Sequence, residues 1–292
     1  MTELLLYPIL ASVLVAIVCG VMGPLTLLRH NTYAAGAISH ACFAGLGAAR
    51  YCTVVFGLGW LSPMAGALLV AIGTALFLAS RRNAAVGKTA VAGSSDSALS
   101  AVWAVGMAIG LLFLSATPGY QSDLINYLFG SILLVTPDIL VAMAILALLI
   151  PLAVFLFRRG ILSVSFNAEA ATLRGEATAF YERVISILTA CTVVLLVRTV
   201  GIILVIALLT LPALVARRIA KRLPAILCLS FVFTLLSLFA GLALSWYFDI
   251  QPSAPTVLIA ACIALLARAC SACRRKYACP CRHAHHLELT RK

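Results

Sequence analysis

The stretch of sequence that decides the fold is residues 184–218, "VISILTACTVVLLVRTVGIILVIALLTLPALVARR". Its two apolar halves, 184–197 and 200–216, are each shorter than the roughly 20 residues that a full membrane span needs. Basic residues flank the stretch at both ends, so the chain must cross a membrane twice or enter it and return. Two helices that meet near Gly201 satisfy both demands. Because a break of this kind is tolerated only where protein or water surrounds it, we expect the stretch to lie at the centre of a bundle.

The composition of the whole chain points to a membrane protein. Hydrophobic residues make up 63% of the 292 residues and charged residues only 10%, and the mean hydropathy is +1.12. A soluble domain of this length needs far more polar surface. The first apolar stretch, about 4–28, has no basic segment before it and is long enough to span a bilayer of roughly 30 Å. We interpret it as a retained span and not as a cleaved signal.

The basic residues are clustered between apolar blocks, although the formal net charge of +12 could suggest a nucleic-acid partner. All but Arg50 and Arg198 of the 21 Lys and Arg residues lie in such short clusters. This is the positive-inside pattern of membrane proteins and not a nucleic-acid-binding face. It predicts an amino terminus outside and a carboxyl tail in the cytoplasm. Aromatic residues then lie in or beside the outer connections, as an interfacial belt should: Trp60, Tyr120, Tyr127, Trp246 and Tyr247.

The predicted fold is an all-α polytopic membrane protein with about 8–9 transmembrane helices. Residues 1–268 form the transmembrane domain, and residues 269–292 form a cytoplasmic tail rich in Cys, His and basic residues. The apolar blocks on which this prediction rests are 4–28, 34–56, 61–80, 97–116, 136–157, 184–197, 200–216, 224–247 and 254–268.

His40 lies in the otherwise apolar segment "GAISHACFAGLGAARY" (36–51). An ionisable side chain is costly in a membrane and is therefore a functional candidate. Small residues at every fourth position, Ala37, Ala41, Gly45 and Ala49, predict close contact with a neighbouring helix. The neutral imidazole is either a ligand for zinc or manganese or a group that hydrogen-bonds a backbone carbonyl. The local sequence leaves both possibilities open.

The carboxyl tail concentrates residues that bind metals. It holds a CxxC pair, a CxC pair and three histidines: Cys270, Cys273, Cys279, Cys281, His283, His285 and His286. Thiolates this close in sequence are typical of structural zinc sites, but the gap between the two pairs is shorter than in zinc fingers. The tail is therefore either a regulatory or buffering metal site or a solvated segment with adventitious binding or none. The six other cysteines lie in apolar segments, where buried structural thiols are the expected reading.

The chain carries no nucleotide-binding motif of its own. "AVGKTA" (85–90) has Arg82 at the leading position, where a P-loop needs Gly, so ATP hydrolysis would require a partner. Two cytoplasmic loops could lie on the membrane surface or contact such a partner. They are "RRGILSVSFNAEAATLRGEATAFYER" (158–183) and "LPALVARRIAKRLP" (211–224).

Six stretches occur in an order that matches one known family: AGAISHA (35–41), DSALSAVWAVGMAIG (96–110), INYLFGSILLV (125–135), EAATLRG (169–175), TVGIILVIALLTLPALVAR (199–217) and DIQPSAPTVL (249–258). Together, over residues 5 to about 267, the chain resembles the permease subunit of ABC-type zinc/manganese/iron importers. The resemblance implies a cobalamin-importer-like bundle with interrupted central helices, in the bacterial cytoplasmic (inner) membrane. It also implies a cytoplasmic ATP-binding subunit, an extracytoplasmic metal-binding protein, and a second permease, either a copy of this chain or a paralogue. Zinc or manganese, with iron possible, is cargo and not a permanently bound cofactor.

The same resemblance implies a metal path through His40, and the neighbouring Ser39 or Cys42 could assist it as a further ligand. The family has an aspartate four residues before this histidine and another in Tyr-Leu-Phe-Gly-Asp, and here these positions are Gly36 and Ser131. Two readings stay open. Either a paralogue in a heterodimer keeps the acidic ligands, which we favour slightly, or the path is softer and prefers zinc to manganese.

By analogy with the cobalamin and siderophore importers, the segment from Pro212 to Pro224 is expected to be the helix that contacts the ATPase. Its residues are Pro212, Arg217, Arg218, Lys221 and Arg222, and the 166–178 loop with Glu169 and Gly175 is a secondary contact. The basic residues could instead bind anionic lipid headgroups.

Two other functions compete with ATP-driven import. A membrane scaffold or receptor could sense metal through the Cys/His tail without transporting it. A passive or ion-coupled carrier would usually need acidic residues inside the membrane, and we place none of the nine Asp and Glu residues in the middle of a span.

Overall fold

The chain folds as an all-α membrane bundle. The computed structural model describes residues 2–29, 32–57, 62–85, 94–118, 130 and 132–277, and no strand occurs within these ranges. Eight of the described helices are long and apolar enough to cross a membrane. The fold class predicted from composition and hydropathy is therefore confirmed.

The described elements follow one another in a simple order. They are α1 (Thr2–Leu28), α2 (Thr32–Val55), α3 (Pro63–Ala85), α4 (Ser94–Ser115), the 3₁₀ turn η1 (Ile132–Leu134), α6 (Pro137–Leu156), α7 (Arg158–Phe166), α8 (Ala168–Leu173), α9 (Thr178–Val200), α10 (Ile202–Ile219), α11 (Leu223–Phe248) and α12 (Ser253–Tyr277). The helix α2, with 24 residues, matches these spans in length but is not one of the eight. Counted with α2, the described part of the chain holds nine helices of membrane-spanning length.

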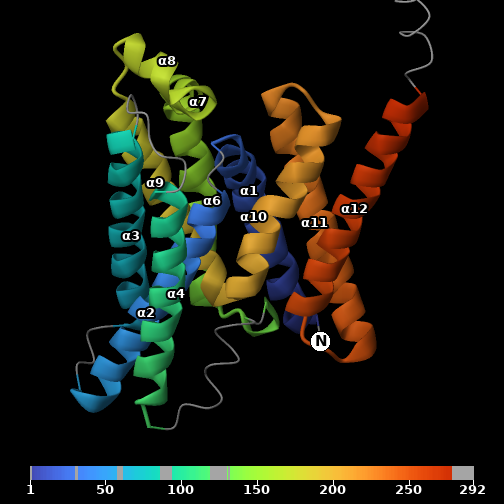
Figure 1. Cartoon of the computed structure of the whole chain (residues 1–292). Coiled ribbons are helices and arrows are strands. Elements are labelled where there is room, and N and C mark those ends of the chain that lie inside the picture. Colours follow the sequence, from blue (N-terminus) through green and yellow to red (C-terminus); the bar gives the residue numbers. More distant parts are fainter. Residues whose placement is uncertain are drawn as a thin grey trace, which may run out of the picture.

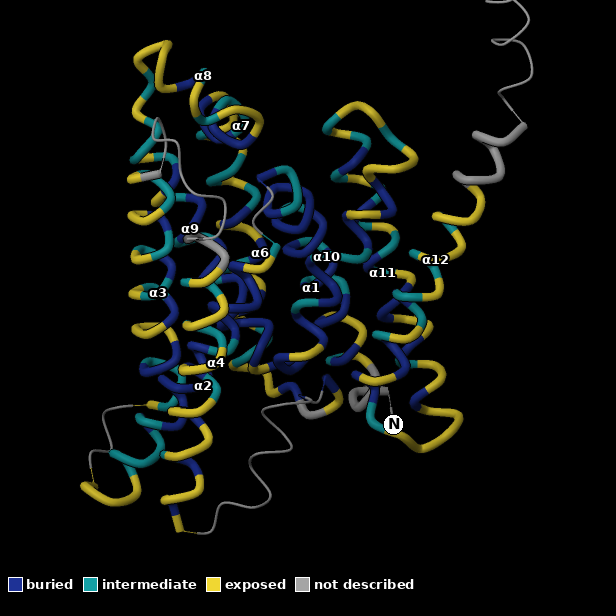
Figure 2. The backbone as a smooth tube through the Cα atoms, viewed as in Figure 1, coloured by how far each residue is buried: buried dark blue, intermediate teal, exposed yellow. Residues whose placement is uncertain are grey.

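The helices α1, α9 and α10 form the centre of the bundle, and they have the largest buried shares among the candidate spans (Figure 2). On one side, α2 packs between α3 and α4, and α3 packs on α9. On the other side, α11 and α12 pack on α10 and α1 (Figure 1). The prediction that the stretch 184–218 is central is thus confirmed.

Gly201 reverses the chain between α9 and α10. Its φ is +87°, a conformation that glycine adopts without steric cost. Its amide donates to Val197 at 3.1 Å, and its carbonyl accepts from Val205 at 3.1 Å. The backbone groups at the break are therefore satisfied inside the protein, as a membrane requires. We call the end of the bundle that contains this turn the Gly201 end, and the opposite end the α7–α8 end.

The sequence reading made α9 too short. We expected the first helix to begin near residue 184, because Glu182 and Arg183 interrupt the apolar block. Instead α9 begins at Thr178 and is 23 residues long. Glu182 is only 1% exposed and is paired with arginines from other helices, so its charge does not end the buried part of α9.

The predicted coupling helix from Pro212 to Pro224 does not exist as a separate element. Pro212 lies inside α10, which continues to Ile219, and α11 begins at Leu223 after a tight turn. A proline at this position leaves α10 intact because neighbouring helices surround it within the bundle. The basic residues of this segment therefore belong to a helix end and a turn.

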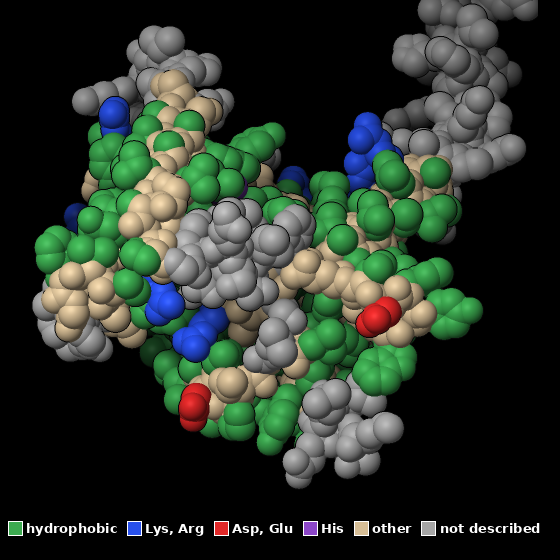
Figure 3. All heavy atoms as spheres, turned by 90° about the horizontal axis from the view of Figure 1, so that it is seen from below, with side chains coloured by type: hydrophobic (Ala, Val, Ile, Leu, Met, Phe, Trp, Pro, Cys, Tyr) green, Lys and Arg blue, Asp and Glu red, His purple; other side chains and the backbone are tan. Residues whose placement is uncertain are grey.

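The Gly201 end carries few charged side chains among those visible in Figure 3, where hydrophobic ones predominate. Trp246 and Tyr247 are 64% and 81% exposed at the end of α11. Their position near one end of the bundle agrees with an interfacial aromatic belt. The other predicted belt residues, Trp60, Tyr120 and Tyr127, lie outside the described residues.

Glycines bring α2, α3 and α4 into close contact. A Cβ atom at Gly66 of α3 would lie 2.4 Å from the Cβ of Ala49 and 2.6 Å from the carbonyl oxygen of Gly45, both in α2. On the other side, a Cβ atom at Gly106 of α4 would lie 2.9 Å from the Cα of Ala41. The small-residue face predicted for α2 is therefore confirmed as a contact surface. Gly45 and Ala49 contact α3, and Ala41 contacts α4.

This packing predicts opposite effects for two glycines of α3. Gly66→Ala should lower the free energy of unfolding by about 1–3 kcal/mol, because the new methyl group has no room and forces α2 and α3 apart. Gly73→Ala should leave stability equal or raise it by about 0.5–1 kcal/mol, because nothing lies within 4 Å of its Cβ position and alanine favours the helix. Thermal unfolding of the purified proteins in detergent measures both. Equal melting temperatures for the two variants would contradict the packing.

Candidate metal path and coupling surface

His40 lies on the side of α2 that faces α4. Its Nδ1 atom is 3.1 Å from the Sδ atom of Met107. Its ring stacks on the indole of Trp103, with centroids 4.6 Å apart and planes 24° from parallel. The ring is half-buried. The structure thus gives His40 side-chain neighbours from α4, and not the backbone carbonyl that the sequence left open as its partner.

The contact between α2 and α4 follows a regular register. Gly36 and His40 are one helical turn apart on α2, and Trp103 and Met107 are one turn apart on α4, so each pair lies on one face of its helix. Trp103 faces Gly36: a Cβ atom at Gly36 would lie 2.7 Å from the indole Cζ3. The large side chain of α4 fills the space that the missing side chain of α2 leaves.

Ser39 and Cys42 are not brought together with His40. The Ser39 hydroxyl is fully buried and donates to the carbonyl of Ala35 at 2.8 Å. Cys42 is 1% exposed and belongs to the apolar core. It follows His40 by two positions, which places it about 200° away around the helix. Their assisting role, predicted from the sequence, therefore has no support in this geometry.

Carboxylates are absent from the surroundings of His40 among the described residues. Within these residues, no group of three or more His, Cys, Asp and Glu side chains could hold a metal ion. Position 36 carries no side chain, and Ser131, the second departure from the family pattern, lies outside the described residues. The donor atom that lies within reach of His40 is the thioether sulfur of Met107.

Gly130 packs directly against the turn at Gly201. Gly130 has φ +63°, and a Cβ atom there would lie 2.2 Å from the amide nitrogen of Gly201. The side chain of Gln251 donates to the Gly130 carbonyl at 2.8 Å. These contacts hold Gly130 against the turn between α9 and α10.

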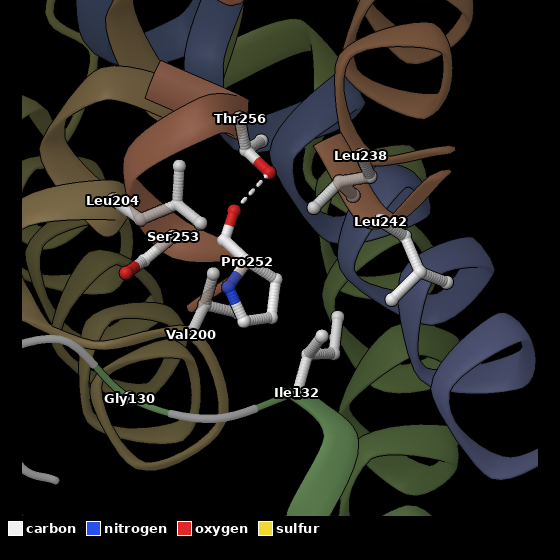
Figure 4. A pocket seen from close by; sticks show the side chains of 9 residues that line it. All are labelled: Gly130, Ile132, Val200, Leu204, Leu238, Leu242, Pro252, Ser253 and Thr256. Atoms are coloured by element: carbon white, nitrogen blue, oxygen red, sulfur yellow. Dashed lines mark hydrogen bonds between the residues drawn. The ribbon is translucent and has the colours of Figure 1, made fainter. Parts of the chain in front are cut away.

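A cavity of about 10 Å³ lies beside Gly130, with room for a single water molecule. Side chains from α9, α10, α11, α12 and η1 line it (Figure 4). The Thr256 hydroxyl donates to the Pro252 carbonyl at 2.7 Å, and the buried Ser253 hydroxyl has no partner within the described residues. A hydrated metal ion does not fit in this cavity.

The predicted coupling residues lie at the α7–α8 end. Arg217 and Arg218 are exposed in the last turn of α10, and Lys221 and Arg222 are exposed in the turn that follows. Glu169 is exposed in the first turn of α8. Gly175 has φ +76° in the turn between α8 and α9, with open space around it.

The helices α7 and α8 present apolar side chains outside the bundle. Phe166 is 66% exposed and Leu173 is 89% exposed. The supporting structure is well packed: a Cβ atom at Gly160 would overlap the ring of Tyr181, and Asn167 caps α8 by accepting from the amide of Ala170 at 3.0 Å. We call Phe166, Leu173 and the exposed residues around them the α7–α8 surface.

A buried ion cluster lies beneath this surface. The guanidinium of Arg29, at the end of α1, pairs with the carboxylate of Glu182 in α9, and both side chains are about 2% exposed or less. The Nε atom of Arg82, at the end of α3, lies 3.5 Å from the same carboxylate, and its guanidinium also donates to the Arg29 carbonyl at 3.0 Å. Burial and the neighbouring Arg82 charge both lower the pKa of Arg29. The Glu182 carboxylate supplies the counter-charge that a buried guanidinium needs.

Most of the predicted tail site lies outside the residues whose side chains the structure describes. Cys270 is exposed on α12, and the helix backbone continues to Tyr277. The side chain of Cys273 is not described. The other predicted ligands lie outside the described residues: Cys279, Cys281, His283, His285 and His286. Metal binding by the tail remains a prediction.

Sequence reasoning missed three neighbours that matter here. No sequence motif marks Met107 and Trp103. Their spacing of four residues puts them on one face of α4, but this has meaning only once α4 is known to pack on α2. The pairing of Arg29 with Glu182 joins residues that are 153 positions apart. Only the cost of an unpaired charge in a membrane could have pointed to it.

Comparison with known proteins gives a consistent picture. A model of the ABC 3 transport family matches residues 1–271. An uncharacterized membrane protein, slr2045 of Synechocystis, is 32% identical over 89% of this chain and 88% of its own length. The manganese transport system membrane protein MntC of Halalkalibacterium halodurans is 31% identical over 88% of this chain and 84% of its own length.

Among solved structures, one described as PsaBC from Streptococcus pneumoniae in complex with Fab superposes with a TM-score of 0.77. It is 25% identical and covers 90% of each chain. The similarity therefore covers nine tenths of the chain and is not confined to a few helices.

The ion cluster makes a prediction about stability. Glu182→Gln should lower the free energy of unfolding by about 3–5 kcal/mol, because it leaves Arg29 buried without a counter-charge. Glu169→Gln, at an exposed site, should change it by less than about 0.5 kcal/mol. Thermal unfolding in detergent compares the two variants.

A double variant separates the charge effect from a packing effect. Arg29→Met combined with Glu182→Leu removes both charges and should recover most of the lost stability. If Glu182→Gln melted at the wild-type temperature, the carboxylate would not be a required counter-charge, and the cluster would have no structural role.

Proposed function

The chain belongs to the ABC 3 transport family, and on this basis we propose that it is the membrane permease subunit of an ATP-binding-cassette importer for a divalent transition metal ion. The family match and the names of the relatives support metal transport as the function. Zinc and manganese are the leading substrates, and iron is a further one. The ion is cargo that passes through and is not a resident cofactor.

The observation that carries the proposal is the α7–α8 surface. Leucine and phenylalanine side chains exposed on short helices outside a membrane bundle are costly unless a partner covers them. The chain has no P-loop, so energy for uphill transport must come from another subunit. We infer that a cytoplasmic ATP-binding subunit covers the α7–α8 surface, with the basic residues of the α10–α11 turn beside it.

The orientation follows from this assignment. The α7–α8 end is cytoplasmic in a bacterial inner membrane, in agreement with the positive-inside pattern. The carboxyl end of α12 lies at the same end. The Gly201 end then faces outward, where an extracytoplasmic metal-binding protein delivers the ion. A second permease, a copy of this chain or a paralogue, completes the transporter.

Alternating access gives each part of the structure a role. ATP binding in the partner moves the α7–α8 surface, and α9 follows because α8 is joined to it by a short turn. The motion changes the α9–α10 turn at Gly201, against which Gly130 packs. We infer that opening at this turn admits the ion and that closing it prevents the ion's return. The buried ion cluster transmits the motion, because it ties α9 to α1 and α3.

A metal-sensing scaffold without transport is not favoured as an alternative. The family match extends through the transmembrane bundle up to residue 271, and most of the Cys/His tail lies beyond it. A sensor would not need to match a transport family over the whole bundle.

One substitution tests the proposed coupling. Leu173→Asp places a charge in the apolar contact and should lower ATP-dependent metal uptake at least tenfold, since the carboxylate would be buried there without a partner. Ile219→Asp, at the exposed last residue of α10, should have a smaller effect. Uptake by cells that express the whole transporter is measured with a radioactive metal, alongside the amount of permease in the membrane.

The control is Leu173→Met, which keeps the apolar surface and should transport normally. If Leu173→Asp transported like the wild type while Ile219→Asp abolished uptake, the ATPase contact would lie on the α10–α11 turn and the assignment of the α7–α8 surface would be wrong. Uptake that persisted after inactivation of the ATPase would contradict ATP-driven import itself.

A further inference from the structure

We propose that Met107 is a metal ligand together with His40, so that the two side chains form a nitrogen–sulfur half-site that favours a thiophilic cation such as zinc over manganese. This inference rests on the proposed function, because it names the class of ion that the same path accepts. It assigns a ligand role to Met107, which no motif in the sequence suggested.

The distance between the two donor atoms suits a shared cation. Zinc bonds its imidazole nitrogen at about 2.0–2.1 Å and a thiolate sulfur at about 2.3 Å, which is a lower bound for a thioether, so the two donors lie at least about 3.1–3.6 Å apart for angles between 90° and tetrahedral. Nδ1 of His40 and Sδ of Met107 are 3.1 Å apart. The pair therefore needs to move by a few tenths of an ångström to take up the ion.

The chemistry of the empty pair also permits binding. When the ring hydrogen is on Nδ1, it can donate to the thioether, which is only a weak acceptor. When a cation arrives, the ring hydrogen resides on Nε2 and the Nδ1 lone pair turns to the metal, as in the neutral imidazole of ordinary metal sites. No net proton is released in this step, and little hydrogen-bond energy is lost.

The α2–α4 contact fixes both donors in place. A Cβ atom at Gly106 would lie 2.9 Å from the Cα of Ala41 and 3.0 Å from the carbonyl carbon of His40. This close approach of the two backbones sets Met107 directly beside His40. The indole of Trp103 stacks on the face of the His40 imidazole and limits its rotation. The imidazole is therefore held in position for binding.

The same contact leaves no room for an acidic ligand at position 36. Trp103 occupies the space beside Gly36, where an acidic side chain would otherwise reach toward His40. Carboxylate and water oxygens suit manganese, whereas thioether sulfur and imidazole suit softer cations. Among the described residues, the half-site thus offers sulfur where a manganese site would offer oxygen. The remaining ligands come from the second permease or from water.

Competitive uptake tests the proposal. Cells that express the whole transporter are given zinc and manganese together, and both are measured in the cells by mass spectrometry. Met107→Leu keeps the volume and apolar character but removes the sulfur. It should lower the zinc-to-manganese uptake ratio about tenfold, the size of effect seen when an interaction that supports a metal site is lost, while manganese uptake changes little.

Met143→Leu is the matched control, since it removes the thioether of a fully buried methionine on α6, away from His40. It should leave the ratio unchanged. A second readout is zinc affinity of the purified full-length chain, measured by competition with a fluorescent chelator. Met107→Leu should weaken binding at one site by about tenfold, whereas Met143→Leu should not weaken it.

The outcomes separate this inference from the proposed function. If the wild type takes up neither metal, the importer itself is refuted. If the wild type transports metal but Met107→Leu keeps the zinc-to-manganese ratio and the zinc affinity of the wild type, then Met107 only packs against His40 and the nitrogen–sulfur site is refuted. A fall in both readouts for Met107→Leu alone supports the site.

Discussion

The constraint on which the rest of the structure depends is the buried charge of Glu182. A carboxylate that is 1% exposed at the membrane end of a helix must be neutralised, and here Arg29 and Arg82 do so from two other helices. The cluster therefore joins α1, α3 and α9 at one point. Since α9 follows directly from α7 and α8, the same point also fixes the α7–α8 surface relative to the core of the bundle.

A second constraint, the close packing of α2, shapes the candidate path. Glycines on α3 and α4 allow two helices to approach the backbone of α2 from different sides. The approach of α4 decides which side chains reach His40, and these are Trp103 and Met107. Packing and chemistry are thus coupled, because the glycine contact that holds the helices together also selects the donor atoms near His40.

Much of the fold could be predicted from the sequence, because a membrane leaves few alternatives. Apolar blocks of sufficient length become helices, and the turn at Gly201 follows from two short blocks flanked by basic residues. The small-residue face of α2 was likewise visible. These features depend on residues close together in the chain, where spacing and composition carry the information.

The features that escaped prediction depend on contacts between distant residues. Glu182 looked like a loop residue because its partner Arg29 is 153 positions away, and α9 was therefore begun too late. The segment 212–224 looked like a surface helix because Pro212 suggested a break, whereas α10 continues through it. Met107 is 67 positions from His40, so only the packing of α4 on α2 reveals it. Ser39 and Cys42 were chosen for proximity in sequence, but they point elsewhere on the helix.

Metal flux in proteoliposomes tests the central claim most directly. The permease, its ATP-binding partner and the second permease are reconstituted together, with the extracytoplasmic binding protein and the metal on the side of the Gly201 end. ATP is supplied only on the side of the α7–α8 surface, and a trapped fluorescent chelator reports the ion there. The account predicts that metal crosses toward the ATP only while ATP is hydrolysed. Hydrolysis without metal movement, or equal movement without ATP, would contradict it.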